Sequence, residues 1–248
     1  LTPKVIITVD LFGLPANYPA IRKIADAHRL FILEDGAQGF GGMIGNKRAC
    51  SFGDISTTSF FPAKPLGCYG DGGAVFTDND EWAALADSYR VHGKGMFKYD
   101  NVRIGMNSRL DTLQAAILKI KFKAFREYEL RDINKAAALY TKLLAGRVKT
   151  PVTPEGYYSS WAQYTICLNS REERDALQAC LKEQGIPSMV YYPTPMHGQT
   201  AYKALNAPTD CCPTAKRLCD TVLSLPVHPY ITEEEIETVC SVILGFVR

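Results

Sequence analysis

The run LFILED at residues 30–35 decides the fold of this chain. Four apolar residues followed by two carboxylates are typical of a strand that is buried on both faces of a parallel sheet. A similar run, KVIITVD, lies at residues 4–10, and between the two runs Asn17 caps a segment with helical periodicity that extends to about residue 29. Strand, helix and strand in this order predict a right-handed βαβ unit and therefore an α/β fold.

The rest of the chain predicts a second, smaller domain. Short strands at residues 55–60 and 74–77 extend the sheet, and the Ser108-x-x-Asp111 pattern predicts a helix that starts near Ser108 and continues to about residue 144. Beyond it we expect strands at 163–168 and 188–192, and helices capped by Ser170 and Thr232. We therefore divide the chain into a mostly parallel α/β part, residues 1–125, and a long linking helix with a small α+β domain, residues 126–248.

Composition and charge exclude several classes of protein. The 248 residues are 46% hydrophobic and carry a formal net charge of +2, so we expect neither a nucleic-acid nor a membrane partner. The sequence has no apolar stretch long enough to cross a bilayer and no signal-peptide pattern at its start. Its eight cysteines contain no Cys-x-x-Cys pair, so we expect no metal and a reducing, cytoplasmic location.

The carboxyl end of the predicted strand at residues 30–35 carries residues suited to ligand binding. Asp35 ends the buried run and Gln38 follows it, at the edge of the sheet where ligands of α/β proteins bind. A carboxylate there can pair with a protonated ring nitrogen, although a lone Asp in such a place more often caps the next turn.

The segment TSFFPAKPLG at residues 58–67 holds a lysine between two prolines. The prolines predict a rigid, non-helical loop, which suits a lysine that must reach one fixed carbon atom. Ser59 offers a hydroxyl to a phosphate. Taken alone, Lys64 fits a surface lysine in a proline-rich turn better.

The segment GMNSRLD at residues 105–111 holds a further set. Asn107 and Ser108 stand at the predicted start of a helix, which is a natural phosphate site, and Arg109 can receive a carboxylate through two hydrogen bonds. Ordinary capping of the helix by Ser108 is the other interpretation.

The order and spacing of these sets resemble the DegT/DnrJ/StrS family of aminotransferases, which use pyridoxal 5'-phosphate (PLP) and act on sugars. The segments SFFPAKPLGCYGDGGAVFT (59–77) and GMNSRLDTLQAAIL (105–118) carry the resemblance most specifically, and it extends over essentially the whole chain. It implies a fold-type I architecture, with residues 1–125 as the C-terminal part of the PLP-binding large domain, and a homodimer whose subunits share their active sites.

The resemblance also implies a role for each candidate residue. Lys64 matches the Schiff-base lysine, and Asp35 the carboxylate on the pyridine nitrogen. The other cofactor-binding positions are Gln38 against the ring, Ser59 on the phosphate and Asn107, which the partner subunit supplies to the phosphate. Tyr192 and His197, in YYPTPMHGQ (191–199), match a segment that approaches the substrate, and Arg109 is the third residue that we expect to bind it.

The activity that this resemblance implies is transfer of an amino group, usually from glutamate, to a nucleotide-linked keto-sugar. Members that act on UDP-linked 2-acetamido-3-keto-sugars or uronic acids, for surface polysaccharides and related glycans, are the most similar. Family members also carry an N-terminal stretch with a phosphate-binding glycine-threonine turn that this sequence lacks. We therefore expect a truncated or processed chain with weakened cofactor binding.

Three alternatives stay open at this point. Related sugar dehydratases replace the lysine with histidine, so Lys64 argues against that activity. A nicotinamide-dependent oxidoreductase is less favoured, because GFGGMIG at residues 39–45 lacks the G-x-G-x-x-G spacing and does not lead into an apolar helix. The third alternative is a non-enzymatic protein, either a catalytically weak or inactive fragment or a regulatory relative.

Overall fold

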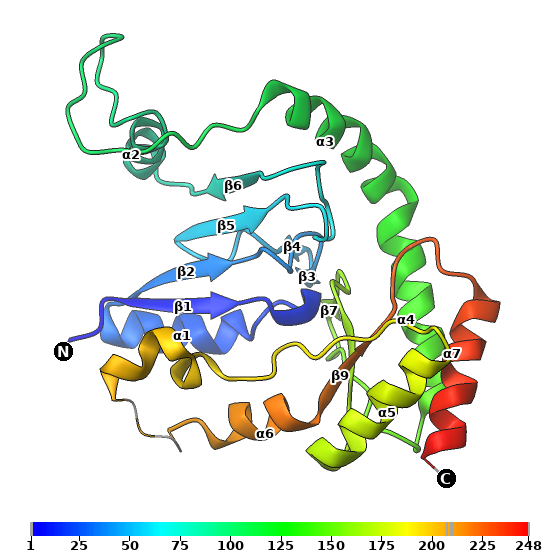
Figure 1. The fold of residues 1–248 in the computed structure, drawn as a ribbon. Helices are drawn as coiled ribbons and strands as arrows, with labels where there is room; N and C mark the ends of the chain where they lie inside the picture. Colours follow the sequence, from blue (N-terminus) through cyan, green and yellow to red (C-terminus); the bar gives the residue numbers. More distant parts are fainter. Residues whose placement is uncertain (1, 207, 209–210, 248) are drawn as a thin grey trace. The chain divides into compact units, whose positions relative to one another are not determined.

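Four strands form the main sheet in the order β1-β2-β5-β6 (Figure 1). They are β1 (Val5–Val9), β2 (Phe31–Asp35), β5 (Ile55–Ser59) and β6 (Gly73–Phe76). The structure, a computed structural model, describes residues 2–206, 208 and 211–247. β1, β2 and β5 run parallel, whereas β6 is antiparallel to β5. The predicted α/β fold with a mostly parallel sheet is confirmed.

Helix α1 (Tyr18–His28) connects β1 to β2 and completes the predicted βαβ unit. The side chain of Asn17 accepts a hydrogen bond from the Ala20 amide, as its position in the sequence predicted. The helix buries Tyr18 and Ala25 against Ile32 of β2. Tyr18 also stacks on Phe52, with 4.6 Å between the ring centroids, so the helix is fixed to the loop before β5.

Glu34 is fully buried in the sheet although its side chain is a carboxylate. It accepts hydrogen bonds from the amides of Cys50, Phe52 and Gly53 and from the hydroxyl of Ser56. A buried carboxylate is tolerated only when its oxygens are satisfied in this way. The loop before β5 is therefore folded around this one side chain of β2.

Asp10 is a second fully buried acid, at the end of the β1 segment. Its Oδ1 atom accepts hydrogen bonds from the Tyr18 hydroxyl, at 2.7 Å, and from the Ala16 amide, at 3.0 Å. A Cβ atom on Gly39 would lie 2.4 Å from the Asp10 side chain, so only glycine fits beside it. Burial raises the pKa of Asp10 and the neighbouring Glu34 raises it further, while the bonds from Tyr18 and Ala16 oppose the rise.

The remaining elements of this part of the chain flank the sheet. Strands β3 (Met43–Ile44), β4 (Lys47–Arg48) and β7 (Tyr157–Tyr158) form a small antiparallel sheet. The η1 turn (Leu11–Gly13) follows β1, and α2 (Asp80–Arg90) follows β6. Helix α3 (Thr112–Ala124) continues into the π-helical turn η2 (Phe125–Glu129).

The chain separates into two compact units. The first takes in the chain up to Leu130 together with Thr153–Ala162, and the second takes in Arg131–Val152 and the chain from Gln163 onward. The division into residues 1–125 and 126–248 stays a prediction about domains. Within the part that the structure describes, no helix is both long and apolar enough to cross a membrane.

The second unit is a small α+β arrangement. Its antiparallel strands β8 (Tyr164–Cys167) and β9 (Val222–Leu225) accompany helices α4 (Leu130–Leu144), α5 (Arg171–Glu183), α6 (Pro213–Thr221) and α7 (Glu233–Phe246). The predicted capping box is present at α7, where Thr232 and Glu235 bond each other's backbone amides. The strand predicted at 188–192 is reduced to a single bridge between Met189 and Ser224. Short 3₁₀ turns, η3 (Met196–Gly198) and η4 (Thr200–Leu205), follow it.

The contacts of Glu34 predict that Glu34→Gln destabilises the protein. The carboxamide has one acceptor oxygen and would turn an N–H₂ group toward amide donors, so we expect a loss of about 2–4 kcal/mol in the free energy of unfolding. Urea unfolding measures this change, with Glu237→Gln on the exposed face of α7 as the matched control. Equal unfolding midpoints for the two variants would contradict the role given to Glu34.

The environment of Asp10 predicts a pH dependence of stability. Because its pKa is raised in the folded state, its contribution to stability is complete at pH values below the unfolded pKa and is lost as the pH rises toward the folded pKa. Asp10→Asn removes this titration, so the variant should become more stable relative to the wild type as the pH rises. A pKa difference of one between the two states corresponds to about 1.4 kcal/mol.

Urea unfolding at acidic, neutral and mildly alkaline pH tests this prediction. The exposed Asp71→Asn variant is the control and should follow the wild type at each pH. A constant stability difference between Asp10→Asn and the wild type would show that Asp10 keeps an ordinary carboxyl pKa.

Candidate active site

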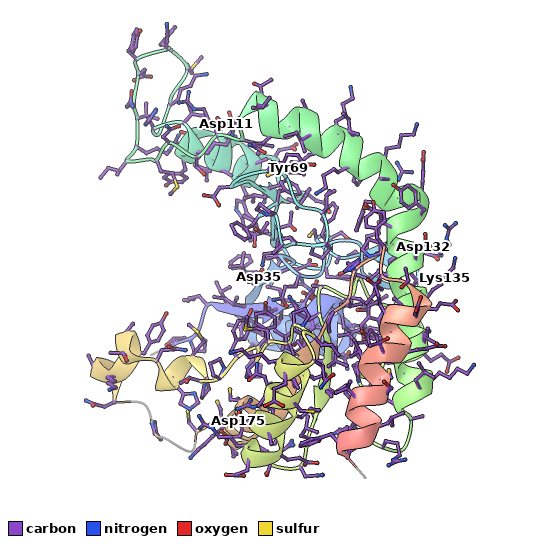
Figure 2. All side chains as sticks on the ribbon, turned by 45° about the vertical axis from the view of Figure 1, so that its right-hand side comes forward. Asp35, Tyr69, Asp111, Asp132, Lys135 and Asp175 are labelled. Carbon is purple, nitrogen blue, oxygen red and sulfur yellow. The ribbon has the colours of Figure 1, made fainter. Side chains whose placement is uncertain are left out.

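The carboxyl ends of β2 and β5 lie next to each other and form the candidate site. Asp35 is the last residue of β2 and pairs with Thr57 of β5, while Ser59 ends β5. Because the two strands are parallel, both ends meet at one edge of the sheet, which is where ligands of open α/β sheets bind. In Figure 2 the loop that carries Tyr69 lies above the strand end that carries Asp35.

Asp35 is half-buried and oriented by its own turn. Its Oδ1 atom accepts a hydrogen bond from the Ala37 amide at 3.0 Å, and its main-chain oxygen accepts one from the Asp10 amide at 3.0 Å. The turn-capping role considered for a lone strand-end Asp is therefore present. It also fixes the carboxylate, so that Oδ2 is the oxygen that would meet a cationic group.

Gln38 is buried and held at two points. Its Oε1 atom accepts a hydrogen bond from the Phe12 amide at 2.6 Å, and its main-chain oxygen accepts one from the Ser160 hydroxyl at 2.7 Å. These two bonds fix both the side chain and the main chain of Gln38, three residues beyond Asp35.

Lys64 lies on a loop that is closed at its base. The Cys68 amide donates to the Phe60 carbonyl at 2.7 Å, and the Lys64 amide donates to the Phe61 carbonyl at 2.9 Å. Leu66 and Cys68 are buried in the core with Leu118 and Phe125. A Cβ atom on Gly67 would lie 2.5 Å from the Pro62 oxygen, so the tight closure requires glycine. The half-buried lysine is thus presented by an anchored loop.

Ser59 sits between this loop and the strand. Its hydroxyl accepts a hydrogen bond from the Phe61 amide at 3.2 Å, which shapes the turn that leaves β5. The structure therefore brings Asp35, Gln38, Ser59 and the Lys64 loop to one edge of the sheet. The four side chains supply a carboxylate, a carboxamide, a hydroxyl and an amine.

The helix start predicted at Ser108 is wrong. Helix α3 begins at Thr112 with Asp111 as its N-cap residue. The Ser108 amide donates to the Arg90 carbonyl at 2.9 Å, and Asn107 forms a β-bridge with Val91. These bonds hold residues 106–108 extended along the end of α2, so their amides do not form the first turn of a helix.

Asn107 and Arg109 consequently lie in the segment that precedes α3 and outside the first turn of that helix. Both are exposed, and the Arg109 Nε atom donates to the Asn107 Oδ1 atom at 2.9 Å. Their roles toward a phosphate and a substrate stay predictions.

Tyr192 and His197 belong to the second unit. The Tyr192 ring is half-exposed and lies against the Tyr191 ring at 5.4 Å between centroids, and His197 lies in the turn η3. Their assignment near a substrate also stays a prediction.

Three residues that support the site were not singled out in the sequence. Asp10 is the buried acid directly after β1, Glu34 is the buried acid of β2, and the Ser160 hydroxyl donates a hydrogen bond to Gln38 across 122 residues of sequence. The sequence held a signal for Asp10, because KVIITVD ends in an acid as LFILED does. In the structure, the preceding residue Val9 pairs with Asp35. No local pattern points to Ser160, because its partner is distant in the chain.

Comparison with known proteins gives a consistent result. The model of the DegT/DnrJ/EryC1/StrS aminotransferase family matches residues 2–244. A UDP-2-acetamido-2-deoxy-3-oxo-D-glucuronate aminotransferase of Pseudomonas aeruginosa is 41% identical over 97% of this chain and 66% of its own length. A pleiotropic regulatory protein of Geobacillus stearothermophilus is 42% identical over 99% of this chain and 66% of its own length.

A solved structure is also similar. The crystal structure of a DegT DnrJ EryC1 StrS aminotransferase from Brucella abortus matches this chain with a TM-score of 0.93 and 48% sequence identity. The match covers 98% of this chain and 64% of the Brucella abortus chain. The chain thus spans slightly less than two thirds of the length of these relatives. Since the family model extends over nearly every residue and the fold coincides with that of a solved member, this chain belongs to the DegT/DnrJ/EryC1/StrS aminotransferase family.

Proposed function

We propose that this chain provides the cofactor-holding lysine and carboxylate of a PLP-dependent aminotransferase. The observation that carries the proposal is the meeting of Asp35, Gln38, Ser59 and the Lys64 loop at the carboxyl ends of β2 and β5. A lysine that forms a Schiff base and an acid that pairs with the pyridine nitrogen are the groups by which proteins hold PLP. The donor set at this edge therefore fits that cofactor.

Each residue then has a definite task. Lys64 would hold the cofactor through its Nζ atom and, once released, would move a proton from the α-carbon of the amino donor. Asp35 would keep the ring nitrogen protonated through Oδ2, and Gln38 would lie against the ring. Ser59 would donate its hydroxyl to the phosphate. When bound, PLP supplies an electron sink that stabilises a carbanion.

For the substrate we propose a nucleotide-linked keto-sugar, with glutamate as the amino donor. The name of the Pseudomonas aeruginosa relative supports a UDP-linked 2-acetamido-3-keto-sugar or its uronic acid. Arg109, Tyr192 and His197 are the residues that we assign to this substrate. Such a product would serve polysaccharide or related glycan synthesis in the cytoplasm, and the structure holds all eight cysteines as thiols, in keeping with a reducing compartment.

We further propose that the protein works as a homodimer in which Asn107 reaches the partner's site. Large apolar side chains gather in the segment around Asn107, and Ile104 is 96% exposed. Exposed apolar patches of this kind mark interaction surfaces. The side chains concerned are those of Met96, Phe97, Tyr99, Ile104, Met106 and Leu113.

One observation favours a second candidate function. The Geobacillus stearothermophilus relative bears the name of a regulatory protein. A protein that keeps the fold but binds no cofactor would agree with that name. Cofactor binding by the chain therefore discriminates between the two functions.

The first function predicts that PLP bonds covalently to Lys64. We expect the chain mixed with stoichiometric PLP to gain visible absorbance, and borohydride reduction followed by peptide mapping to place the label on Lys64. Lys64→Ala should lose both signals, because it removes the amine that we assign to the cofactor, while Lys119→Ala, at an exposed position of α3, should keep them. Labelling spread evenly over surface lysines would instead support the regulatory function.

The dimer predicts a change of mass in solution. Light scattering after size-exclusion chromatography should give twice the chain mass for the wild type, and Ile104→Glu should shift it toward the monomer because a charge would enter an apolar interface. Val152→Glu, at an exposed position of the second unit, is the control and should stay dimeric. A monomeric wild type at every concentration tested would contradict self-association of this chain.

A further inference from the structure

Three side chains that favour soft metal ions come together in the second unit. His197, Cys211 and Cys212 each offer one donor atom, and these three atoms all lie within 4.8 Å of one another. The set is unlike the candidate active site, whose donors are a carboxylate, a carboxamide, a hydroxyl and an amine. We therefore expect these three side chains to bind a ligand of a different kind.

Two ordered backbone segments hold these donors. His197 lies in the turn η3, which is closed by bonds from the Gly198 amide to the Pro195 carbonyl, at 2.9 Å, and from the Gln199 amide to the Met196 carbonyl, at 3.1 Å. The imidazole is thus carried by a short hydrogen-bonded turn.

The two thiols stand where helix α6 begins. Cys212 is the N-cap residue of α6, its carbonyl accepts from the Lys216 amide at 3.1 Å, and Pro213 occupies the first turn of the helix. The Cys211 amide donates to the Pro208 carbonyl at 3.2 Å. Proline at the start of a helix restricts the backbone there, so the backbone positions that carry the two adjacent thiols are defined.

The chemistry of the donors selects the ion. Thiolate and imidazole are the usual ligands of zinc, whereas calcium and magnesium require oxygen ligands. Tetrahedral zinc with bonds of about 2.3 Å to sulfur places two sulfur ligands about 3.8 Å apart. The three donor atoms lie within 4.8 Å of one another, so their separations are near the range that such an ion requires.

We propose that His197, Cys211 and Cys212 bind one zinc ion and leave its fourth position open to solvent. Both cysteines are exposed, so an ion there is reachable by water or by a small ligand. The proposal does not depend on the aminotransferase function, since the candidate PLP residues lie in the first unit. Zinc at this site would also engage His197, which we assign above to the substrate.

The proposal differs from the expectation of no metal, which was based on the absence of a Cys-x-x-Cys pair and stays untested. The two cysteines are adjacent, and the histidine comes from a separate turn earlier in the chain. Only the fold brings the third donor to the other two.

Cobalt titration of the 248-residue chain, kept reduced by a phosphine, tests the proposal. Tetrahedral cobalt bound to thiolates gives intense visible bands and a sulfur-to-cobalt charge-transfer band. We expect one equivalent to saturate these bands and zinc to displace them. Cys211→Ser, Cys212→Ser and His197→Gln should each weaken cobalt binding at least about tenfold, because each removes one ligand.

Matched controls come from the same unit. Cys219→Ser lies further along α6 and His228→Gln lies before α7, and both should bind cobalt as the wild type does. Circular dichroism checks that each variant keeps its helices. As a measurement without variants, one equivalent of zinc should protect Cys211 and Cys212, and not Cys219, from alkylation by iodoacetamide.

Two results would overturn the proposal. The first is a wild-type chain with no thiolate–cobalt band, or with unchanged alkylation of Cys211 and Cys212 in the presence of zinc. The second is equal loss of binding in the control variants, which would place the ion on other thiols. Neither result bears on PLP binding at Lys64, so the two proposals fail separately.

Discussion

The buried carboxylate of Glu34 is the interaction on which the first unit depends. It accepts hydrogen bonds from three backbone amides of the loop before β5 and from the hydroxyl of Ser56 in that strand. A carboxylate removed from water requires such donors, and the loop in turn requires an acceptor for its amides. Since Glu34 immediately precedes Asp35, the bonds that fix the β2–β5 pair also fix the position of Asp35 relative to the end of β5.

The candidate site is a consequence of this pairing and of three local devices. The Asp35 carboxylate accepts a hydrogen bond from the Ala37 amide, and Gln38 accepts hydrogen bonds from the Phe12 amide and the Ser160 hydroxyl. The loop of Lys64 is closed by backbone hydrogen bonds and anchored by two buried side chains. These contacts hold Lys64 in place although it lies in neither a helix nor a strand. Functional groups held by supporting contacts of this kind are oriented before a ligand arrives. The edge of the sheet that Glu34 stabilises thus also carries the residues that we propose for the chemistry.

The second unit combines a packed aromatic core with turns that carry metal-binding side chains. Its core contains the stacked pair Tyr140 and Tyr164, while its exposed turns carry His197 and two adjacent thiols. The helix α6 fixes one thiol at its first turn, and the turn η3 fixes the imidazole. Short turns next to a rigid helix are common places for ligand-binding residues, because the helix supplies the rigidity that the turns lack.

The sequence by itself determined the βαβ unit, the mostly parallel sheet, the caps of α1 and α7, and the placing of Asp35 and Lys64 in their segments, because each depends on neighbours a few residues apart. Tertiary structure alone decided the rest. Ser108 starts no helix because its amide bonds to Arg90, Ser160 reaches Gln38 from a distant segment, and His197 meets two cysteines across a turn. These contacts join residues whose separation leaves no local pattern, so only the folded chain could reveal them.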